Sequence, residues 1–178
     1  MIAGDCMTNK ELCERYPFLI PFNRFSGMRM TDPRASQGGF WPGSPDEIPD
    51  PYNYEYTELD EMPDGWRNAF GEQMCEEIRE ALLKFGGEEA LDKYRVEQIK
   101  EKFGYLRWYD CYGCKEVDDI ISKYEEISEN TCIRCGKPAT MISLGWISPF
   151  CGDCAEELGK NEYIKFAPSD KNPLNAEI

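Results

Sequence analysis

The sequence contains no histidine and has little positive charge. Lys and Arg number 20 against 34 Asp and Glu, so the formal net charge of the 178 residues is −14. The missing imidazole excludes the Ser-His-Asp and Cys-His nucleophile systems, the H-E-x-x-H metal site and the His-ligated zinc deaminases in their usual forms. The excess of carboxylates argues against a surface that binds phosphates throughout. We therefore expect a protein that is not an enzyme.

Long apolar runs are also missing. No stretch approaches 18 apolar residues, and Phe18-Leu19-Ile20 is enclosed by Pro17 and Pro21. This pattern predicts neither a signal peptide nor a transmembrane helix, so we expect a cytoplasmic protein with no membrane partner. In a reducing cytosol, the nine cysteines are interpreted as metal ligands before disulfides.

Two pairs of cysteines carry the strongest signal. Cys132 and Cys135 are separated by two residues, and after a spacer of fifteen residues Cys151 and Cys154 repeat that spacing. Such spacing is typical of a four-cysteine site for structural zinc, which leaves no open position for water. We predict a short hairpin between the pairs and a helix after the second, which is the order of a treble clef. A zinc ribbon is the close alternative, and four unpaired or disulfide-bonded cysteines are the other interpretation.

A third pair, Cys111 and Cys114, lies between a predicted strand and a predicted helix. A helix N-terminus can lower the pKa of a thiol, so this context suggests a thiol oxidoreductase. The pair could equally supply half of a second metal site. We favour two ordinary cysteines near a turn, because no βαβ pattern surrounds them.

The periodicity predicts two helices in the first half of the chain. Thr8 and Glu11 have capping-box spacing, so a short helix should end before Pro17. A longer helix should begin with Asp64 as its N-cap and end at Gly86-Gly87. Its apolar side chains recur every four residues and are predicted to pack in the core: Trp66, Phe70, Met74, Ile78 and Leu82.

The sequence pattern in the middle of the chain predicts a hairpin followed by a helix. Residues 94–100 should pair with the aromatic segment 105–109, and apolar positions between 117 and 127 should form one helix face. The predicted fold class is α+β, a small helical and hairpin domain with a C-terminal treble-clef or zinc-ribbon module. The predicted divisions are an acidic, loop-rich region 1–65, a helix-hairpin-helix core 66–130, a zinc module 131–165 and a loose tail 166–178.

The predicted hairpin is a candidate for nucleic-acid contact. Its cations alternate with aromatic residues, which can follow a phosphate backbone and stack on bases. Nearby acids at positions 92, 97, 101 and 110 nearly cancel the charge, so we favour a solvated, salt-bridged hairpin over a nucleic-acid-binding regulator. The candidate residues are Lys93, Arg95, Lys100, Lys102 and Arg107.

Residues 35–65 contain eight Asp and Glu but no Lys or Arg. Carboxylates along an extended segment can imitate a row of phosphates, and interleaved tyrosines can imitate bases. Such a surface would be attracted to basic, nucleic-acid-handling proteins, although a loop that merely keeps the protein soluble is the simpler interpretation. The candidate partner-binding residues are Asp46, Glu47, Asp50, Glu55, Glu58, Asp60 and Glu61.

Four blocks of sequence resemble a group of small four-cysteine proteins of bacteriophages and prophages. The blocks are YPFLIPFNRF at 16–25, DGWRNAFGEQMCEEI at 64–78, QIKEKFGYLRWYD at 98–110, and TCIRCGKPAT with GWISPFCGDC within 131–154. The resemblance implies a bacterial host cell. By analogy with small acidic phage proteins, our leading hypothesis is an anti-CRISPR-like inhibitor that blocks nucleic-acid binding by a host defence protein such as a CRISPR nuclease. Direct nucleic-acid binding ranks second and a thiol oxidoreductase third.

Overall fold

The computed structural model describes residues 7–23, 26–32, 34–35, 52–159 and 163–166. Within them, helices alternate with two small antiparallel sheets, one with two strands and one with the order β4-β3-β5. The helices are α1 (Asn9–Arg15), α2 (Asp64–Trp66), α3 (Glu72–Lys93), α4 (Lys115–Glu129) and α5 (Gly152–Glu157), with 3₁₀ turns η1 (Pro17–Leu19) and η3 (Glu58–Glu61) and a π-helical turn η4 (Arg67–Gly71). The strands are β1 (Arg95–Lys102), β2 (Tyr105–Cys111), β3 (Met141–Ser143), β4 (Pro149–Phe150) and β5 (Tyr163–Lys165).

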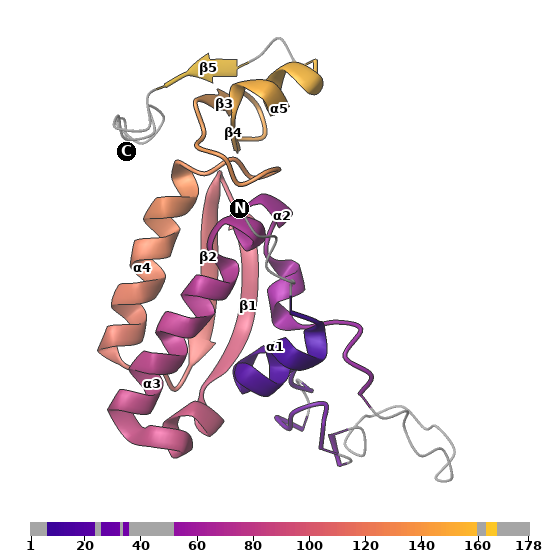
Figure 1. Cartoon of the computed structure of the whole chain (residues 1–178), viewed down its shortest axis with the longest axis vertical. Coiled ribbons are helices and arrows are strands. Elements are labelled where there is room, and N and C mark those ends of the chain that lie inside the picture. Colours follow the sequence, from indigo (N-terminus) through magenta and orange to yellow (C-terminus); the bar gives the residue numbers. More distant parts are fainter. Residues whose placement is uncertain (1–6, 24–25, 33, 36–51, 160–162, 167–178) are drawn as a thin grey trace.

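Two helices cover one face of the long hairpin. Helices α3 and α4 lie side by side against β1 and β2, and the small sheet and α5 sit beyond the far end of this layer (Figure 1). The fold is thus mixed α+β, with a small C-terminal sheet beside the four cysteines, as the coarse fold class predicted.

The predicted helices form, but both boundaries of the longer one differ from the prediction. Thr8 and Glu11 make the predicted capping box of α1, which ends at Arg15. The longer helix does not use Asp64 as its N-cap: Pro63 occupies that position and Asp64 is the first helical residue. In this first turn, the N–H of Gly65 has no partner within the helix and donates to the carbonyl of a distant residue, Ile133, at 3.0 Å.

A glycine pair interrupts α3 where the sequence predicted its end. Gly86 and Gly87 have non-helical backbone angles, and Gly87 has a φ of 65°. The helix then resumes for a short segment up to Lys93. The predicted stripe of apolar residues, from Trp66 to Leu82, is buried as expected.

The hairpin register divides its residues between two faces. Ile99 pairs with Trp108, and both side chains are buried against the helices. A bulge between Val96 and Gln98 shifts the alternation near the start of β1. A two-residue turn, Phe103-Gly104, joins the strands with φ angles of 53° and 84°. Positive φ at both positions is the type I′ geometry that suits the twist of a hairpin.

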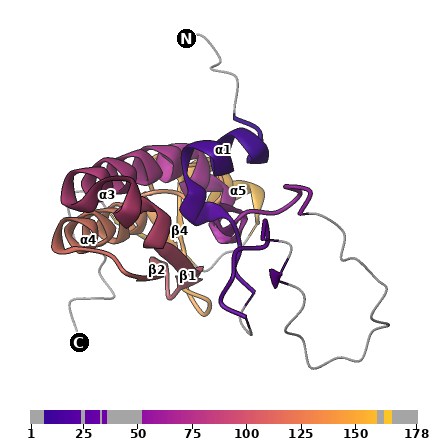
Figure 2. The same cartoon turned by 90° about the horizontal axis from the view of Figure 1, so that it is seen from below.

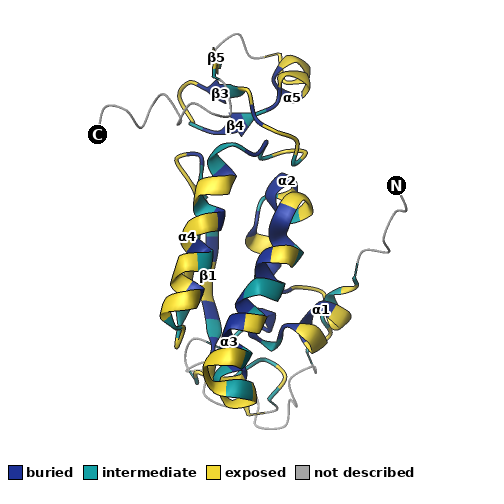
Figure 3. Cartoon of the chain, turned by 60° about the vertical axis from the view of Figure 1, so that its left-hand side comes forward, coloured by how far each residue is buried: buried dark blue, intermediate teal, exposed yellow. Residues whose placement is uncertain are grey.

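One hydrophobic cluster unites the described N-terminal residues with the helices and the hairpin (Figure 3). Phe18 and Leu19 of η1 and Leu59 of η3 are fully buried in it. Trp108 donates its indole N–H to the hydroxyl of Tyr94 at 3.0 Å inside the cluster. Figure 2 shows α1 beside this layer, so the acidic N-terminal region contributes to the same core.

Some expectations fall on residues that the structure does not describe, among them most of the tail 166–178. In the part of the chain that it does describe, no helix is both long enough and apolar enough to cross a membrane.

Candidate metal centre and candidate nucleic-acid interface

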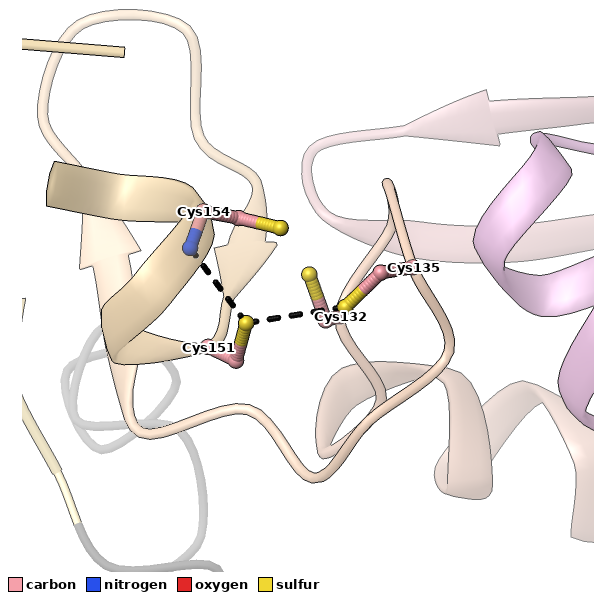
Figure 4. Close-up of side chains that lie close together, drawn as sticks. All are labelled: Cys132, Cys135, Cys151 and Cys154. Carbon is pink, nitrogen blue, oxygen red and sulfur yellow. Dashed lines mark hydrogen bonds between the residues drawn. The ribbon is translucent and has the colours of Figure 1, made fainter. Parts of the chain in front are cut away.

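The four predicted cysteine ligands come together. Cys132 and Cys135 lie on the turn after α4, while Cys151 and Cys154 belong to the start of α5, and the four sulfurs point toward one another (Figure 4). All four lie within 4.8 Å of one another, and the Sγ atoms of Cys135 and Cys151 are 3.5 Å apart. A tetrahedron with metal–sulfur bonds of about 2.3 Å has edges of about 3.8 Å. The thiols therefore fit around a single metal ion.

Backbone hydrogen bonds shape both halves of this cluster. Gly136, at a φ of 76°, donates its N–H to the carbonyl of Cys132, which closes the first turn. Ile133 donates to the carbonyl of Pro149 at 2.9 Å and so joins that turn to β4. Cys151 is the N-cap of α5, and its Sγ accepts the N–H of Cys154 at 3.4 Å. The predicted sequence of turn, hairpin and helix is thus present around the cysteines.

The thiols differ in how readily they ionise. Burial works to raise the pKa of Cys132, but backbone N–H groups of Cys151, Cys135 and Arg134 outweigh it and lower that pKa. Burial and the neighbouring thiols raise the pKa values of Cys135 and Cys154. The thiolate of Cys132 is therefore favoured, while Cys135 and Cys154 hold their protons more tightly. A divalent cation among the sulfurs would allow those thiols to ionise as well.

Two ion pairs connect the first cysteine turn with α5. Lys137 lies 2.9 Å from Asp153, and Arg134 lies 2.7 Å from Glu157. All four side chains are about half exposed or more, so each pair contributes little to stability. Their arrangement nevertheless aligns the two ligand pairs.

The cysteine module docks on the beginning of the long helix. Besides the Gly65–Ile133 bond, Trp66 donates its buried indole N–H to the carbonyl of Thr131 at 2.9 Å. A Cβ atom on Gly65 would lie 2.2 Å from the carbonyl oxygen of Cys132. The helical periodicity predicted only core packing for Trp66 and gave no sign of this role of Gly65-Trp66.

Most of the candidate cations gather on one face of the hairpin, which we call the outer face. In register, Lys100 pairs with Arg107 and Lys102 pairs with Tyr105, on the side opposite the buried Ile99 and Trp108. Lys100 donates to Gln98 and lies 5.0 Å from the ring centroid of Tyr109. Arg107 lies 5.0 Å from the ring centroid of Tyr105, and its guanidinium pairs with Glu125 of α4 at 2.9 Å, so its charge is already partnered. The outer face consists of Gln98, Lys100, Lys102, Tyr105, Arg107 and Tyr109.

The acids that cancel this charge in the sequence are directed elsewhere. Asp92 accepts a hydrogen bond from Arg29 at 2.6 Å. Asp110 is half-buried beside Tyr94, and burial raises its pKa. Glu101 accepts the N–H of Gly104 at 2.6 Å. Only Glu97 of the four is an exposed strand residue, and it pairs with Arg95 at 3.1 Å.

Two candidate cations lie outside the outer face. Lys93 ends α3 and pairs with Glu89 at 2.7 Å. Arg95 is enclosed between the rings of Phe22 and Tyr112, each 5.4 Å away. A hollow of about 630 Å³ lies between Phe22, Asn23 and Gly27 on one side and the hairpin on the other. Lys100, Tyr109 and Glu58 contribute to its wall.

The candidate acidic surface is only partly described. Asp46, Glu47 and Asp50 lie outside the described residues, and Glu55 is exposed. Two further members are engaged within the chain. Asp60 accepts the N–H of Thr57 at 2.6 Å and pairs closely with Arg67, while Glu61 accepts the hydroxyl of Tyr56 at 2.8 Å.

The Cys111 and Cys114 pair shows no activation of its first thiol. Both thiols are free and partly exposed. Burial and a hydrogen bond to Glu97 raise the pKa of Cys111, whereas a reactive thiol needs a lowered one.

Comparison with protein-family models, curated proteins and solved structures finds no match to this chain. The resemblance to bacteriophage and prophage proteins therefore stays a prediction.

Proposed function

We propose that this protein is a zinc-stabilised binding protein, not an enzyme, that holds nucleic acid on the outer face of its hairpin. The observation that carries the proposal is the separation of charge by the hairpin register. Cations and tyrosines of β1 and β2 share one face, while Asp92 and Asp110 turn to other partners. Cations that alternate with aromatic rings can contact phosphates and bases together.

The metal in this proposal is zinc, held by Cys132, Cys135, Cys151 and Cys154 in a treble clef. Four thiolates suit zinc among the divalent metals, and a closed site of this kind stabilises the fold instead of activating water. The order of cysteine turn, β3–β4 hairpin and α5 supports the treble clef over the zinc ribbon.

The inhibitor hypothesis has less support from the described residues. Asp60 and Glu61 already have partners within the chain, so they are less available to a basic protein. If the inhibitor hypothesis holds, a complex with a basic nucleic-acid-handling protein should weaken on reversing Glu55 and Glu58 to Lys. Asp60 should be left intact in that test, because its reversal would disturb η3.

Binding of labelled DNA and RNA at several salt concentrations tests the proposal. The double variant Lys100→Gln/Lys102→Gln removes two cations from the outer face, and Lys10→Gln/Lys115→Gln removes two exposed cations from α1 and α4. For a single strand, losing two phosphate contacts should reduce the slope of log affinity against log salt by about 1.4. The control should keep the parent slope. Equal losses in both variants, or no binding by the parent protein, would contradict the proposal.

A further inference from the structure

Two large aromatic side chains are exposed where the long hairpin meets the cysteine module. Phe103, in the turn between β1 and β2, is 66% exposed, and Trp146, in the loop between β3 and β4, is 78% exposed. Neither ring gains burial in the described structure, although burying such rings contributes most to the energetics of cores and interfaces. Both rings are therefore available to a ligand.

A single carboxylate fixes both segments. One oxygen of Glu101 accepts the N–H of Gly104 at 2.6 Å, and the other accepts the indole N–H of Trp146 at 3.2 Å. Ile147 also packs over Gly104, where an added Cβ would lie 3.4 Å from the Ile147 side chain. Glu101 thus holds both the turn that carries Phe103 and the indole of Trp146, so the indole is oriented before any ligand arrives.

The backbone of Phe103 is unfavourable for its residue type. Its φ of 53° lies in the left-handed region, where Asn or Gly is preferred and other residues incur strain. Because the phenyl ring is exposed, it gains no packing energy that would compensate for the backbone strain. A strained position with no structural benefit is typical of a residue kept for function.

Two lysines beside these rings favour an anionic ligand with flat faces. Lys102 lies 5.9 Å from the Phe103 ring centroid, and the outer face continues from it to Lys100. Arg107, on the same face, is already paired with Glu125. Unpaired bases expose the faces that stack on aromatic side chains, whereas duplex bases are stacked on one another.

From this geometry we propose that the ligand is single-stranded nucleic acid, whose phosphates follow the outer face and whose bases stack on Phe103 and Trp146. The inference rests on the nucleic-acid-binding function proposed above. It gives the cysteine module a direct part in binding, because that module supplies the indole.

Fluorescence titration with a single strand of about twelve nucleotides tests the inference, since this length lies within known site sizes. The chain has four tryptophans, so a Trp146→Phe variant is needed to isolate the Trp146 signal by difference. We expect base stacking to quench that signal. Trp146→Phe should bind nearly as well as the parent, whereas Trp146→Ala should bind about 5- to 150-fold more weakly.

Phe103→Asn separates binding from stability. Asn suits the left-handed turn, so the melting temperature should stay equal or rise while affinity falls over the same range. Phe85→Ala is the matched control, because Phe85 is 67% exposed near the end of α3 that leads into β1. This control should bind like the parent.

The outcomes distinguish the inference from the function on which it rests. Binding that depends on Lys100 and Lys102 but is indifferent to Trp146→Ala and Phe103→Asn would overturn the inference alone. Equal affinity for the matching duplex would also overturn it. Absence of binding to any nucleic acid would overturn both the inference and the proposed nucleic-acid-binding function. That is also the result expected if these rings contact a protein.

Discussion

The backbone N–H of Gly65 donates to the carbonyl oxygen of Ile133 at 3.0 Å. This bond joins the first turn of the long helix to the turn that holds Cys132 and Cys135. The approach is close enough that a Cβ on Gly65 would overlap backbone atoms of both Cys132 and Ile133. The cysteine module is thereby attached to the core through a position that only glycine fits.

Gly65→Ala should break the hydrogen bond between Gly65 and Ile133. Because the obstructing atoms are backbone atoms, they cannot rotate away, and we expect a loss of about 1–3 kcal/mol in the free energy of unfolding. Chemical denaturation measures it. Gly152→Ala is the control, since a Cβ there meets no atom within 4 Å. A Gly65→Ala protein as stable as the Gly152→Ala protein would contradict the close contact of Gly65 with the backbone of Cys132 and Ile133.

Removing the proposed zinc should unfold the cysteine module. Structural zinc contributes on the order of 10 kcal/mol to the folding of small modules, so a strong chelator or Cys135→Ser should lower the melting temperature and abolish metal retention. Elemental analysis and circular dichroism on the same sample check both effects. Cys13→Ser should retain the metal, because Cys13 lies in the hydrophobic core away from the four ligands. Full metal content in Cys135→Ser would refute the ligand assignment.

Asp110 should make stability depend on pH. Burial raises its pKa, so the folded state holds the proton more tightly than the unfolded state. Stability should therefore fall as pH rises from the ordinary Asp pKa of 3.8 through the raised value, with the full loss present above it. Asp110→Asn should be more stable than the parent at neutral pH, and the difference should vanish in acid. Asp119→Asn, exposed on α4, should leave the shape of the pH profile unchanged, and a parallel profile for Asp110→Asn would contradict the expectation.

Cys111 should alkylate slowly at neutral pH. Burial and Glu97 raise its pKa, which reduces the thiolate fraction. Mass spectrometry of iodoacetamide-treated protein should show faster modification of Cys111 in Glu97→Gln than in the parent. Glu116→Gln, in the first turn of α4, provides the comparison. Rapid alkylation in the parent protein, together with insulin reduction lost in Cys111→Ser, would favour the oxidoreductase hypothesis instead.

Local patterns predicted the elements well, because their causes lie within a few residues. The capping box at Thr8 and Glu11, the break at Gly86-Gly87 and the cysteine spacing all act over short distances. Strand β5 was not predicted, since three residues of strand carry no periodic signal and depend on pairing with β3.

The functional surfaces were harder to predict, because they depend on where side chains turn in space. Summing charges along 92–110 suggested a nearly neutral hairpin, yet the register places Lys100, Lys102 and tyrosines on one face, while Asp92 and Asp110 have partners elsewhere. The sum also missed Glu125 of α4, which pairs with Arg107. The bridge from Glu101 to Trp146 connects residues 45 apart, and no local pattern announces it. The cysteine spacing, in contrast, predicted its cluster directly.

The docking of Trp66 also affects how the chain is made. Ribosomes deliver the helix that begins at Asp64 well before residues 131–133, whose carbonyls accept the N–H groups of Gly65 and the Trp66 indole. Until then two donors at the helix start have only water as a partner, and the helix cannot seal this end of the core. The hydrogen bonds at the start of this helix are therefore completed only after the helix and the long hairpin have been synthesised.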